Sequence, residues 1–229
     1  MSDEASISVI VPALNERERI AETLRRLREQ GVREVIVVDG GSEDGTVEAA
    51  RDIADLVCST ASGRAIQMNA GARASSGAIL FFLHADTLVP PQYAAAILKA
   101  CRTPGIIGGR FDIEIDGAGL AYRVIAAAIN VRSRWTGTFT GDQGLFIRRE
   151  TFERLGGFPE IPLFEDLDMS IAMRRIGSVA SLRERLVTSG RRWERQGAAR
   201  TVLLMWGLRG LRALGVAPER LAALYRDIR

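Results

Sequence analysis

Two uninterrupted apolar runs, each leading to an aspartate, restrict the fold of this chain more than any other feature. EVIVV is followed by Asp39, and AILFFLHA is followed by Asp86. Strands that are buried on both faces read as continuous apolar runs and belong to parallel sheets. The carboxyl ends of such strands line the crevice in which open α/β sheets bind ligands. We therefore expect both aspartates at one crevice that holds a nucleotide, with helix capping by each aspartate as the alternative.

Strand and helix patterns alternate through the first half of the chain. Strands are expected at 7–11, 34–38, 56–59 and 78–83. Helices are expected between them, and Asn15, with Glu18 three positions later, has the pattern of an N-cap. Pro90 and Pro91 predict the start of a further helix, because proline is tolerated in a first turn. This βαβαβ order predicts an α/β fold.

The second half has a different pattern. At 107–116, apolar residues alternate with acidic ones, which predicts a half-buried antiparallel strand. Its residues would divide into Phe111, Ile113 and Ile115 toward the core, and Asp112, Glu114 and Asp116 toward solvent. Helices are expected at 120–135 and from Glu165 to Gly177, with a strand at 145–148 between them. No internal repeat or low-complexity linker divides this region.

Length and composition are consistent with an enzyme that has one hydrophobic core. The 229 residues are 47% hydrophobic, which suffices for one full core. We expect a catalytic domain at 1–190, made of a nucleotide-binding half (about 1–105) and an acceptor half (about 106–190), and a helical extension at 191–229. Cys58 and Cys101 lack metal-site spacing and are typical of core cysteines in a reducing compartment. The acidic N-terminus does not resemble a signal peptide, so a cytoplasmic location is expected.

The net charge of +3 is unevenly distributed along the chain. Residues 183–229 contain eleven arginines and four acidic residues, whereas the rest of the chain is acidic overall. Arginines can pair with diphosphate oxygens, or with anionic lipid when they lie on an amphipathic helix. The helix expected at 201–214 contains Arg209 and Arg212 and is too short to span a bilayer. It either lies peripherally on the inner membrane face or packs on the catalytic domain.

Five motifs follow one another within residues 6–176. They are SVIVPALNE, VVDGGSEDGT, GRAIQMNAGARASSGAILFFLHADT, GDQGLFIRRETFERLGGF and FEDLDM. In this order they resemble the inverting family 2 glycosyltransferases with the GT-A fold, and SGRRWERQG adds a resemblance to a small bacterial subfamily of unassigned acceptor. The resemblance implies sugar transfer from a nucleoside diphosphate sugar, with UDP as the expected carrier. The acceptor is unidentified, a lipid-linked acceptor is one candidate, and no nucleic-acid partner is expected.

The resemblance also implies a donor site. Asp39 would hold uracil or ribose, and Asp86 would bind Mg²⁺ or Mn²⁺ as the metal-binding carboxylate of an Asp-x-Asp motif. His84, the only histidine of the chain, replaces the first aspartate of that motif. It would contact ribose, bind the metal or be structural. The other nucleotide-binding residues would be Pro12, Ala13, Asn15, Glu16, Gly40, Ser42, Arg64, Asn69 and Ala85.

An acidic cluster would supply the catalytic base. The acceptor hydroxyl loses a proton as it attacks C1 of the sugar, and a carboxylate can take that proton. The resemblance implies Asp166 in this role, with Glu165 beside it. The alternative is that these carboxylates only favour the positive N-terminus of their helix.

The acceptor side is expected in the loop that contains Gly141, Asp142 and Gln143. Asp142 or Gln143 could bind a sugar hydroxyl, although ordinary turn chemistry also explains these residues. Trp193 resembles, in part, a tryptophan that stacks on a sugar in processive relatives.

Two other functions fit parts of the sequence. A sugar nucleotidyltransferase has a related sheet, but it opens with a GxGTR-like loop where this chain has VPALNE. A catalytically inactive nucleotide-sugar binding protein is the other alternative, because His84 replaces an aspartate. The acidic residues of FEDLD argue against it, although fold alone proves no activity.

Overall fold

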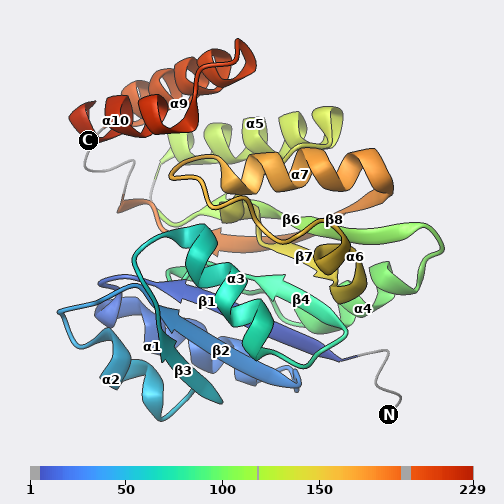
Figure 1. The fold of residues 1–229 in the computed structure, drawn as a ribbon. Coiled ribbons are helices and arrows are strands. Elements are labelled where there is room, and N and C mark those ends of the chain that lie inside the picture. Colours follow the sequence, from blue (N-terminus) through green and yellow to red (C-terminus); the bar gives the residue numbers. More distant parts are fainter. Residues whose placement is uncertain (1–5, 118, 192–196, 229) are drawn as a thin grey trace.

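One mixed sheet organises the molecule. The computed structural model describes residues 6–117, 119–191 and 197–228, and in this part of the chain the strands pair in the order β3-β2-β1-β4-β7-β6-β8-β5. The strands are β1 (Ile7–Ala13), β2 (Glu34–Asp39), β3 (Leu56–Ser59), β4 (Ile79–Phe82), β5 (Thr87–Leu88), β6 (Ile106–Ile115), β7 (Leu145–Arg148) and β8 (Ser178–Thr188). Helices cover both faces of the sheet (Figure 1).

The helices differ widely in length. They are α1 (Arg17–Arg28), α2 (Thr46–Arg51), α3 (Arg64–Ala74), α4 (Tyr93–Arg102), α5 (Leu120–Thr136), α6 (Arg149–Arg154), α7 (Glu165–Ile176), α9 (Ala198–Ala213) and α10 (Pro218–Ile228), with a 3₁₀ turn, η2, at Gly141–Gln143. Among the described residues, no helix is long and apolar enough to cross a membrane.

The first half of the chain forms the parallel part of the sheet, as its apolar runs predict. β1 pairs in parallel with both β2 and β4, and β2 pairs in parallel with β3. Alternate side chains of these strands enter two cores. One core, which includes Val35 and Val37, packs against α1, α4 and α5, and the other, which includes Ile36 and Val38, packs against α3, α6 and α7.

The second half reverses direction at β7. This strand is antiparallel to β4 and to β6, whereas β6 also pairs in parallel with β8 along most of its length. The expectation of an antiparallel strand at 107–116 therefore holds for only one of its two neighbours. β8 was not expected as a strand, because Arg183, Glu184 and Arg185 interrupt its apolar pattern.

Two local expectations were wrong. Asn15 is not the N-cap of α1: it has a positive φ of 55°, and Glu16 takes the cap position without a side-chain cap bond. Asp112 does not face solvent but is buried, because Arg110 and Arg134 from β6 and α5 both pair with its carboxylate. The neighbouring core residues of the strand are buried as expected.

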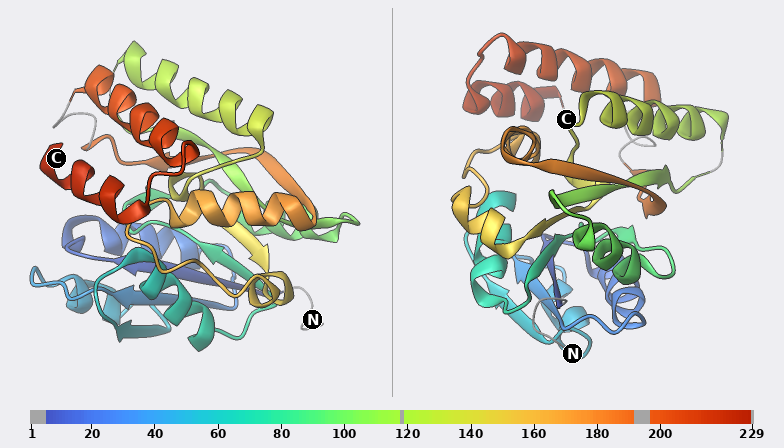
Figure 2. Two further views of the ribbon diagram at one scale, coloured as in Figure 1. Left: turned by 45° about the horizontal axis from the view of Figure 1, so that its top comes forward. Right: turned by 90° about the vertical axis from the view of Figure 1, so that its right-hand side faces the viewer.

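The C-terminal helices form an outer layer. Leu208 of α9 and Leu221 of α10 pack with Phe164 and Leu167, which flank the start of α7. All the views place α9 and α10 near α5 on the same side of the molecule (Figure 2). The helix expected at 201–214 is thus present, with its inner side packed on the start of α7.

Candidate active site

The carboxyl ends of β1 and β2 lie side by side, because Ala13 is paired with Asp39 in the sheet register. Gln67 of α3 holds these two ends together. Its Nε2 donates to the carbonyl oxygens of Ala13 and Val38, each at 2.8 Å, and the side chain is buried. No role was expected for Gln67, although a buried amide among the small and apolar residues of α3 is the signal that could have indicated one.

Asp39 organises the loop that follows β2. Its Oδ2 accepts the backbone N–H groups of Gly41 and Ser42, each at 2.9 Å. Its Oδ1 is buried and has no hydrogen-bond partner within the described residues. A buried acceptor without a donor is costly, so this strand end suits a ligand that brings an N–H or O–H group.

Asn15 joins the loop after β1 to the loop after β2. Its backbone N–H donates to Ser42 Oγ at 2.8 Å, and its side-chain oxygen accepts the N–H of Glu43 at 3.0 Å. The N–H of Glu16 donates to Thr46 Oγ1 at 2.8 Å. Two loops predicted to contact the nucleotide therefore form one hydrogen-bonded rim, with Pro12 and Ala13 at its base.

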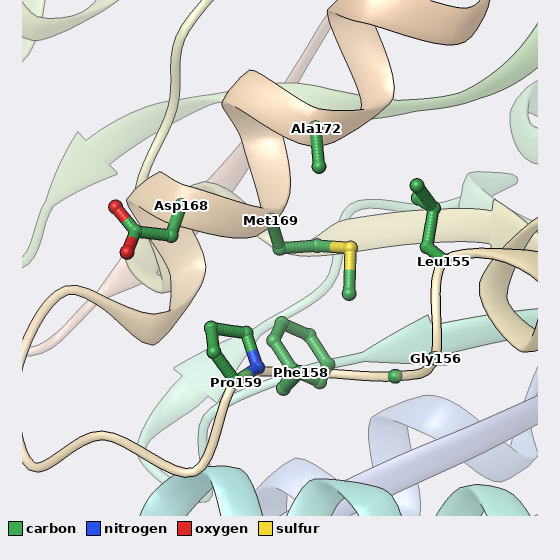
Figure 3. A pocket seen from close by; sticks show the side chains of 8 residues that line it. Leu155, Gly156, Phe158, Pro159, Asp168, Met169 and Ala172 are labelled. Atoms are coloured by element: carbon green, nitrogen blue, oxygen red, sulfur yellow. The ribbon is translucent and has the colours of Figure 1, made fainter.

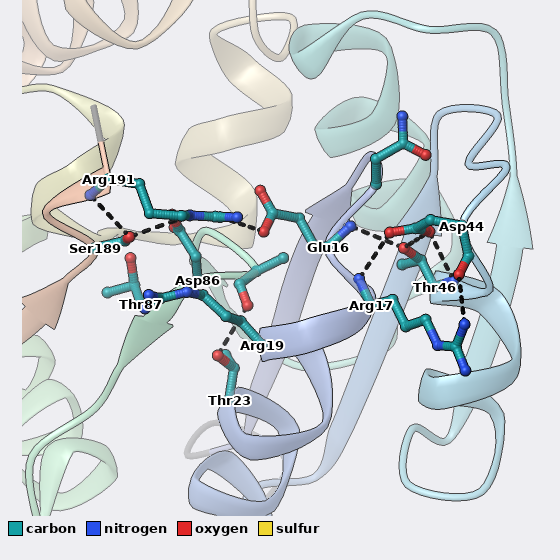
Figure 4. Close-up of polar contacts among 12 residues, drawn as sticks. Glu16, Arg17, Arg19, Thr23, Asp44, Thr46, Asp86, Thr87, Ser189 and Arg191 are labelled. Atoms are coloured by element: carbon teal, nitrogen blue, oxygen red, sulfur yellow. Dashed lines mark hydrogen bonds and ion pairs between the residues drawn. The ribbon is translucent and has the colours of Figure 1, made fainter. Parts of the chain in front are cut away.

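Arg191 connects the C-terminal part of the chain to this rim (Figure 4). Its Nη2 lies 2.5 Å from Glu16 Oε2 and 3.3 Å from Asp86 Oδ2. Burial raises the pKa of Glu16 and the Asp86 carboxylate adds to this, whereas the hydrogen bond from Arg191 opposes it. The sequence alone did not indicate that Arg191 lies at the site, because it is one of many arginines.

The carboxylates of Glu16 and Asp86 together fit a cation, since both already contact the same guanidinium. Within the described ranges, no group of three or more His, Cys, Asp or Glu side chains could hold a metal ion. Mg²⁺ commonly takes one or two protein carboxylates and completes its shell with phosphate oxygens and water. The residues therefore fit a metal whose other ligands come from a bound diphosphate.

Asp166 lies at the first turn of α7, where the backbone is strained. Phe164, just before the helix, is a buried non-glycine residue with φ 72°. Asp166 Oδ2 accepts the N–H of Gly141 at 2.5 Å, and its Oδ1 accepts the N–H of Leu167 at 2.6 Å. The acidic cluster and the expected acceptor loop, 25 residues apart, thus meet at one carboxylate.

The pKa of Asp166 is raised to about 7: burial is the largest cause and the carboxylate of Glu165 adds to it, whereas the Gly141 N–H and Arg64 oppose the shift. Glu165 is itself buried, with Arg64 Nη1 3.9 Å from its Oε1. A carboxylate that titrates near neutral pH is suited to general-base catalysis. Arg64, expected among the nucleotide-binding residues, lies at this carboxylate pair with about half of its side chain exposed.

Gly141 separates His84 from Asp166. A Cβ at this position would lie 2.6 Å from His84 Nε2 and 3.3 Å from Asp166 Oδ2, so only glycine permits the approach. His84 therefore lies between the end of β4 and the loop that contains Gly141. It does not complete a metal-ligand group with Asp86 in the described structure.

Two predicted site residues have their side-chain amides engaged elsewhere. Gln143 is fully buried, and its Nε2 donates to Ser133 Oγ at 3.0 Å. Asn69 is also buried, and its amide makes two 2.9 Å hydrogen bonds with the backbone of Phe158. The structure brings neither amide into the group around Asp39, Asp86 and Asp166, and Trp193 lies outside the described residues.

Two hollows lie apart from these carboxylates. One, of about 350 Å³, is lined by Leu155, Gly156, Gly157, Phe158, Pro159, Asp168, Met169 and Ala172 (Figure 3). The other, of about 500 Å³, lies across the same glycine loop and includes Asn69. Neither hollow is lined by Asp39, Asp86 or Asp166. The candidate site is therefore defined by its charged groups and not by either of these hollows.

Comparison with proteins of known sequence shows related glycosyltransferases. Glycosyltransferase AglE of Haloferax volcanii is 30% identical over 169 residues, which cover 67% of this chain and 56% of AglE. The 4,4'-diaponeurosporenoate glycosyltransferase of Staphylococcus haemolyticus is 36% identical over 98 residues, which cover 39% of this chain and 26% of that protein. The chain thus spans about half the length of AglE, and less of the second relative.

Solved structures show the same fold. Residues 1–349 of S. aureus TarS, in complex with UDP-GlcNAc, match 80% of this chain and 58% of that chain with a TM-score of 0.62 and 22% identity. Glucosyl-3-phosphoglycerate synthase of Mycobacterium tuberculosis, in complex with Mn²⁺, UDP and glucosyl-3-phosphoglycerate, matches 79% of this chain and 70% of that chain with a TM-score of 0.60 and 23% identity. The expected GT-A fold is confirmed.

The family model described as glycosyl transferase family 2 matches residues 8–156. The match includes the strand ends that carry Asp39 and Asp86 and the loop that contacts Asp166. Because it covers more than half of the sequence, this chain belongs to glycosyl transferase family 2.

Proposed function

We propose that this protein is an inverting glycosyltransferase that moves a sugar from a UDP-linked donor to an acceptor hydroxyl, with Asp166 as general base. The observation that carries the proposal is the Asp166 carboxylate, whose pKa of about 7 and hydrogen bond from Gly141 suit it to proton removal. The UDP and UDP-GlcNAc complexes of structural neighbours support the donor class.

Donor binding rests on the rim formed by the loops after β1 and β2. The unpartnered Oδ1 of Asp39 accepts a hydrogen bond from uracil or ribose, and the joined loops of Asn15 and Ser42 border the nucleoside. Arg64, with half its side chain exposed, is available to a diphosphate oxygen.

Asp86 and Glu16 would hold the divalent cation, because both carboxylates contact the same guanidinium. Bound Mg²⁺ or Mn²⁺ supplies Lewis-acid stabilisation of the diphosphate leaving group. Arg191, which contacts both carboxylates, would supply a planar guanidinium suited to pairing with phosphate oxygens. The Mn²⁺ and UDP in the mycobacterial neighbour support a divalent metal cofactor.

The transfer is a single displacement. The acceptor oxygen forms a bond to C1 of the sugar while the bond from C1 to the diphosphate oxygen breaks. The hydroxyl proton passes to Asp166, and the nucleoside diphosphate departs with the bonding electron pair. Attack from the face opposite the leaving group inverts the configuration at C1.

The acceptor reaches Asp166 past the loop of Gly141 and Asp142. We place the reaction in the cytoplasm, at the inner membrane face, with a lipid-linked acceptor. Free Cys58 and Cys101 are consistent with a reducing compartment. The excess of arginine in residues 183–229 favours a nearby anionic surface.

Incubation of the purified chain with UDP-, GDP- and dTDP-linked sugars, with and without Mn²⁺, tests the function. We expect Mn²⁺-dependent release of UDP, by slow hydrolysis without acceptor and faster transfer with one. Release of inorganic diphosphate from a nucleoside triphosphate and a sugar phosphate would instead establish a nucleotidyltransferase. Binding of a nucleotide sugar with no turnover under any of these conditions would indicate a binding protein.

A further inference from the structure

Helix α5 exposes an apolar stripe along its whole length. Leu120, Val124, Val131 and Trp135 are 74%, 58%, 50% and 89% exposed. These positions recur at helical spacing, so they lie on one face. Its opposite side is buried and includes Asn130, which makes two hydrogen bonds with the backbone of β6. Because Tyr122, Ile125 and Ile129 of the same helix pack on the core, α5 has apolar residues on both its inner and its outer sides.

Helix α9 exposes a second apolar stripe. Leu203 and Trp206 are 74% and 67% exposed, Leu214 at the C-cap of the helix is 83% exposed, and the intervening Gly207 and Gly210 are exposed as well. The inner side of this helix is already used, because Leu208 and its neighbours pack on the start of α7. The outward stripe therefore remains available for a partner.

The two helices lie in the same outer layer and carry charge of one sign (Figure 2). Neither sequence, LAYRVIAAAINVRSRWT or AARTVLLMWGLRGLRA, contains an acidic residue, and each contains three arginines. Arg134 and Arg212 pair with Asp112 and Asp168, and the partly buried Arg132 interacts electrostatically with Asp142 and Asp166. Arg123 of α5 is exposed beside the apolar stripe.

We propose that α5 and α9 together form a docking surface for an anionic lipid bilayer. Exposed leucine, valine and tryptophan side chains can enter the region between headgroups and acyl chains, and neighbouring arginines can pair with lipid phosphates. A second copy of the chain fits this face poorly. Two-fold self-association would bring arginine-bearing helices together with no acidic residue on either helix to pair with them.

The surface adjoins both sides of the candidate catalytic base. The chain leaves the end of α5 at Thr136 and reaches Gly141, whose N–H bonds to Asp166. On the other side, α9 packs on Phe164 and Leu167. This proposal rests on the proposed function only in naming the acceptor class: a bilayer on α5 and α9 favours an acceptor that is itself held in the membrane.

Vesicle co-sedimentation of the full chain, without any donor, tests the surface. We expect binding to vesicles of phosphatidylcholine with phosphatidylglycerol, much weaker binding to phosphatidylcholine alone, and release by salt. Trp135→Ser and Trp206→Ser should each weaken binding about tenfold, because each removes a large side chain from the buried interface. Arg123→Glu should reduce the preference for anionic vesicles.

Ile176→Ser is the matched control, since Ile176 is an exposed apolar residue, 41% accessible, at the end of α7. It should bind vesicles like the parent. UDP-induced thermal shifts of every variant report donor binding separately, so a failed donor assignment leaves the vesicle result interpretable. Unchanged sedimentation of both tryptophan variants would overturn the proposal. So would a parent that ignores anionic vesicles but forms a dimer, by light scattering, that Trp135→Ser dissociates.

Discussion

The guanidinium of Arg191 lies 3.3 Å from the carboxylate of Asp86, although the two residues are 105 positions apart. The same nitrogen lies 2.5 Å from Glu16. A positive charge from the chain itself thus occupies the place proposed for a divalent cation. Metal binding must displace it, which makes the affinity for metal depend on a residue that is not a metal ligand.

Arg191→Ala should bind Mn²⁺ about three- to tenfold more tightly than the parent in the absence of nucleotide, because no resident cation has to leave. Calorimetric titration with MnCl₂ measures this directly. Arg28→Ala is the matched control, since it removes the 2.6 Å ion pair with Asp55 at a distant place. Equal or weaker Mn²⁺ binding by Arg191→Ala would show that the arginine does not compete.

Asp39 and Asp86 should affect nucleotide binding differently, because Asp39 is proposed to contact the nucleoside and Asp86 the metal. Asp39→Ala should weaken UDP binding with or without Mn²⁺. Asp86→Ala should abolish the increment due to Mn²⁺ and leave the weaker metal-free binding nearly intact. Titration of both variants with UDP decides this, and a full Mn²⁺ increment in Asp86→Ala would remove Asp86 from the metal site.

Asp166→Asn should lower the transfer rate about a hundredfold or more while donor affinity changes by less than about threefold. The substitution keeps the size of the side chain and removes its basic lone pair, so it acts on the transition state. Transfer kinetics measure the loss, and proton NMR of the product should show a β-linkage from an α-linked donor. Near-normal turnover would pass the role to Glu165 or Asp168, and retained configuration would exclude a single displacement.

The transfer rate should rise with pH through about 7, since the Asp166 carboxyl must be ionised to act as a base. The contribution of Asp166 to the free energy of unfolding should change with pH in the opposite direction. A raised folded pKa means that the folded state binds more protons, so the contribution of Asp166 to stability decreases as pH rises from about 4 to 7. Asp166→Asn should therefore be more stable relative to the parent at pH 8 than at pH 5. Thermal melts at both values check this, and a constant difference would contradict the shift.

Gln67→Leu should lower the free energy of unfolding by about 1–3 kcal/mol, because two buried carbonyl oxygens lose a donor. UDP binding should weaken as well, since the amide ties together the strand ends that carry the donor site. Urea denaturation and UDP titration measure the two effects. Loss of stability with unchanged UDP affinity would limit Gln67 to a structural role.

The strand ends could be predicted because a strand that is buried on both faces has a continuous apolar sequence. Such sequences precede Asp39 and Asp86. The contacts of Arg191 could not, because they join segments 175 and 105 residues apart and nothing in the local sequence specifies the partner. Asn69 and Gln143 were expected at the site from their motifs, but their side-chain amides bond to other parts of the protein. An amide in a motif is equally suited to a ligand and to a backbone carbonyl, and only the packing decides between them.

The antiparallel direction of β7 allows the loop before this strand to vary in sequence without disturbing the strand pairing. Phe82 at the end of β4 is paired with Leu145 at the start of β7, so the chain leaving one strand lies beside the chain entering the other. Substitutions between Gly137 and Gly144 can therefore reshape the approach to Asp166 while the strand pairing stays intact. Since the proposed acceptor side lies in this short loop, substitutions there would change which acceptor binds. The proposed donor site, which lies after β1 and β2, would stay unchanged.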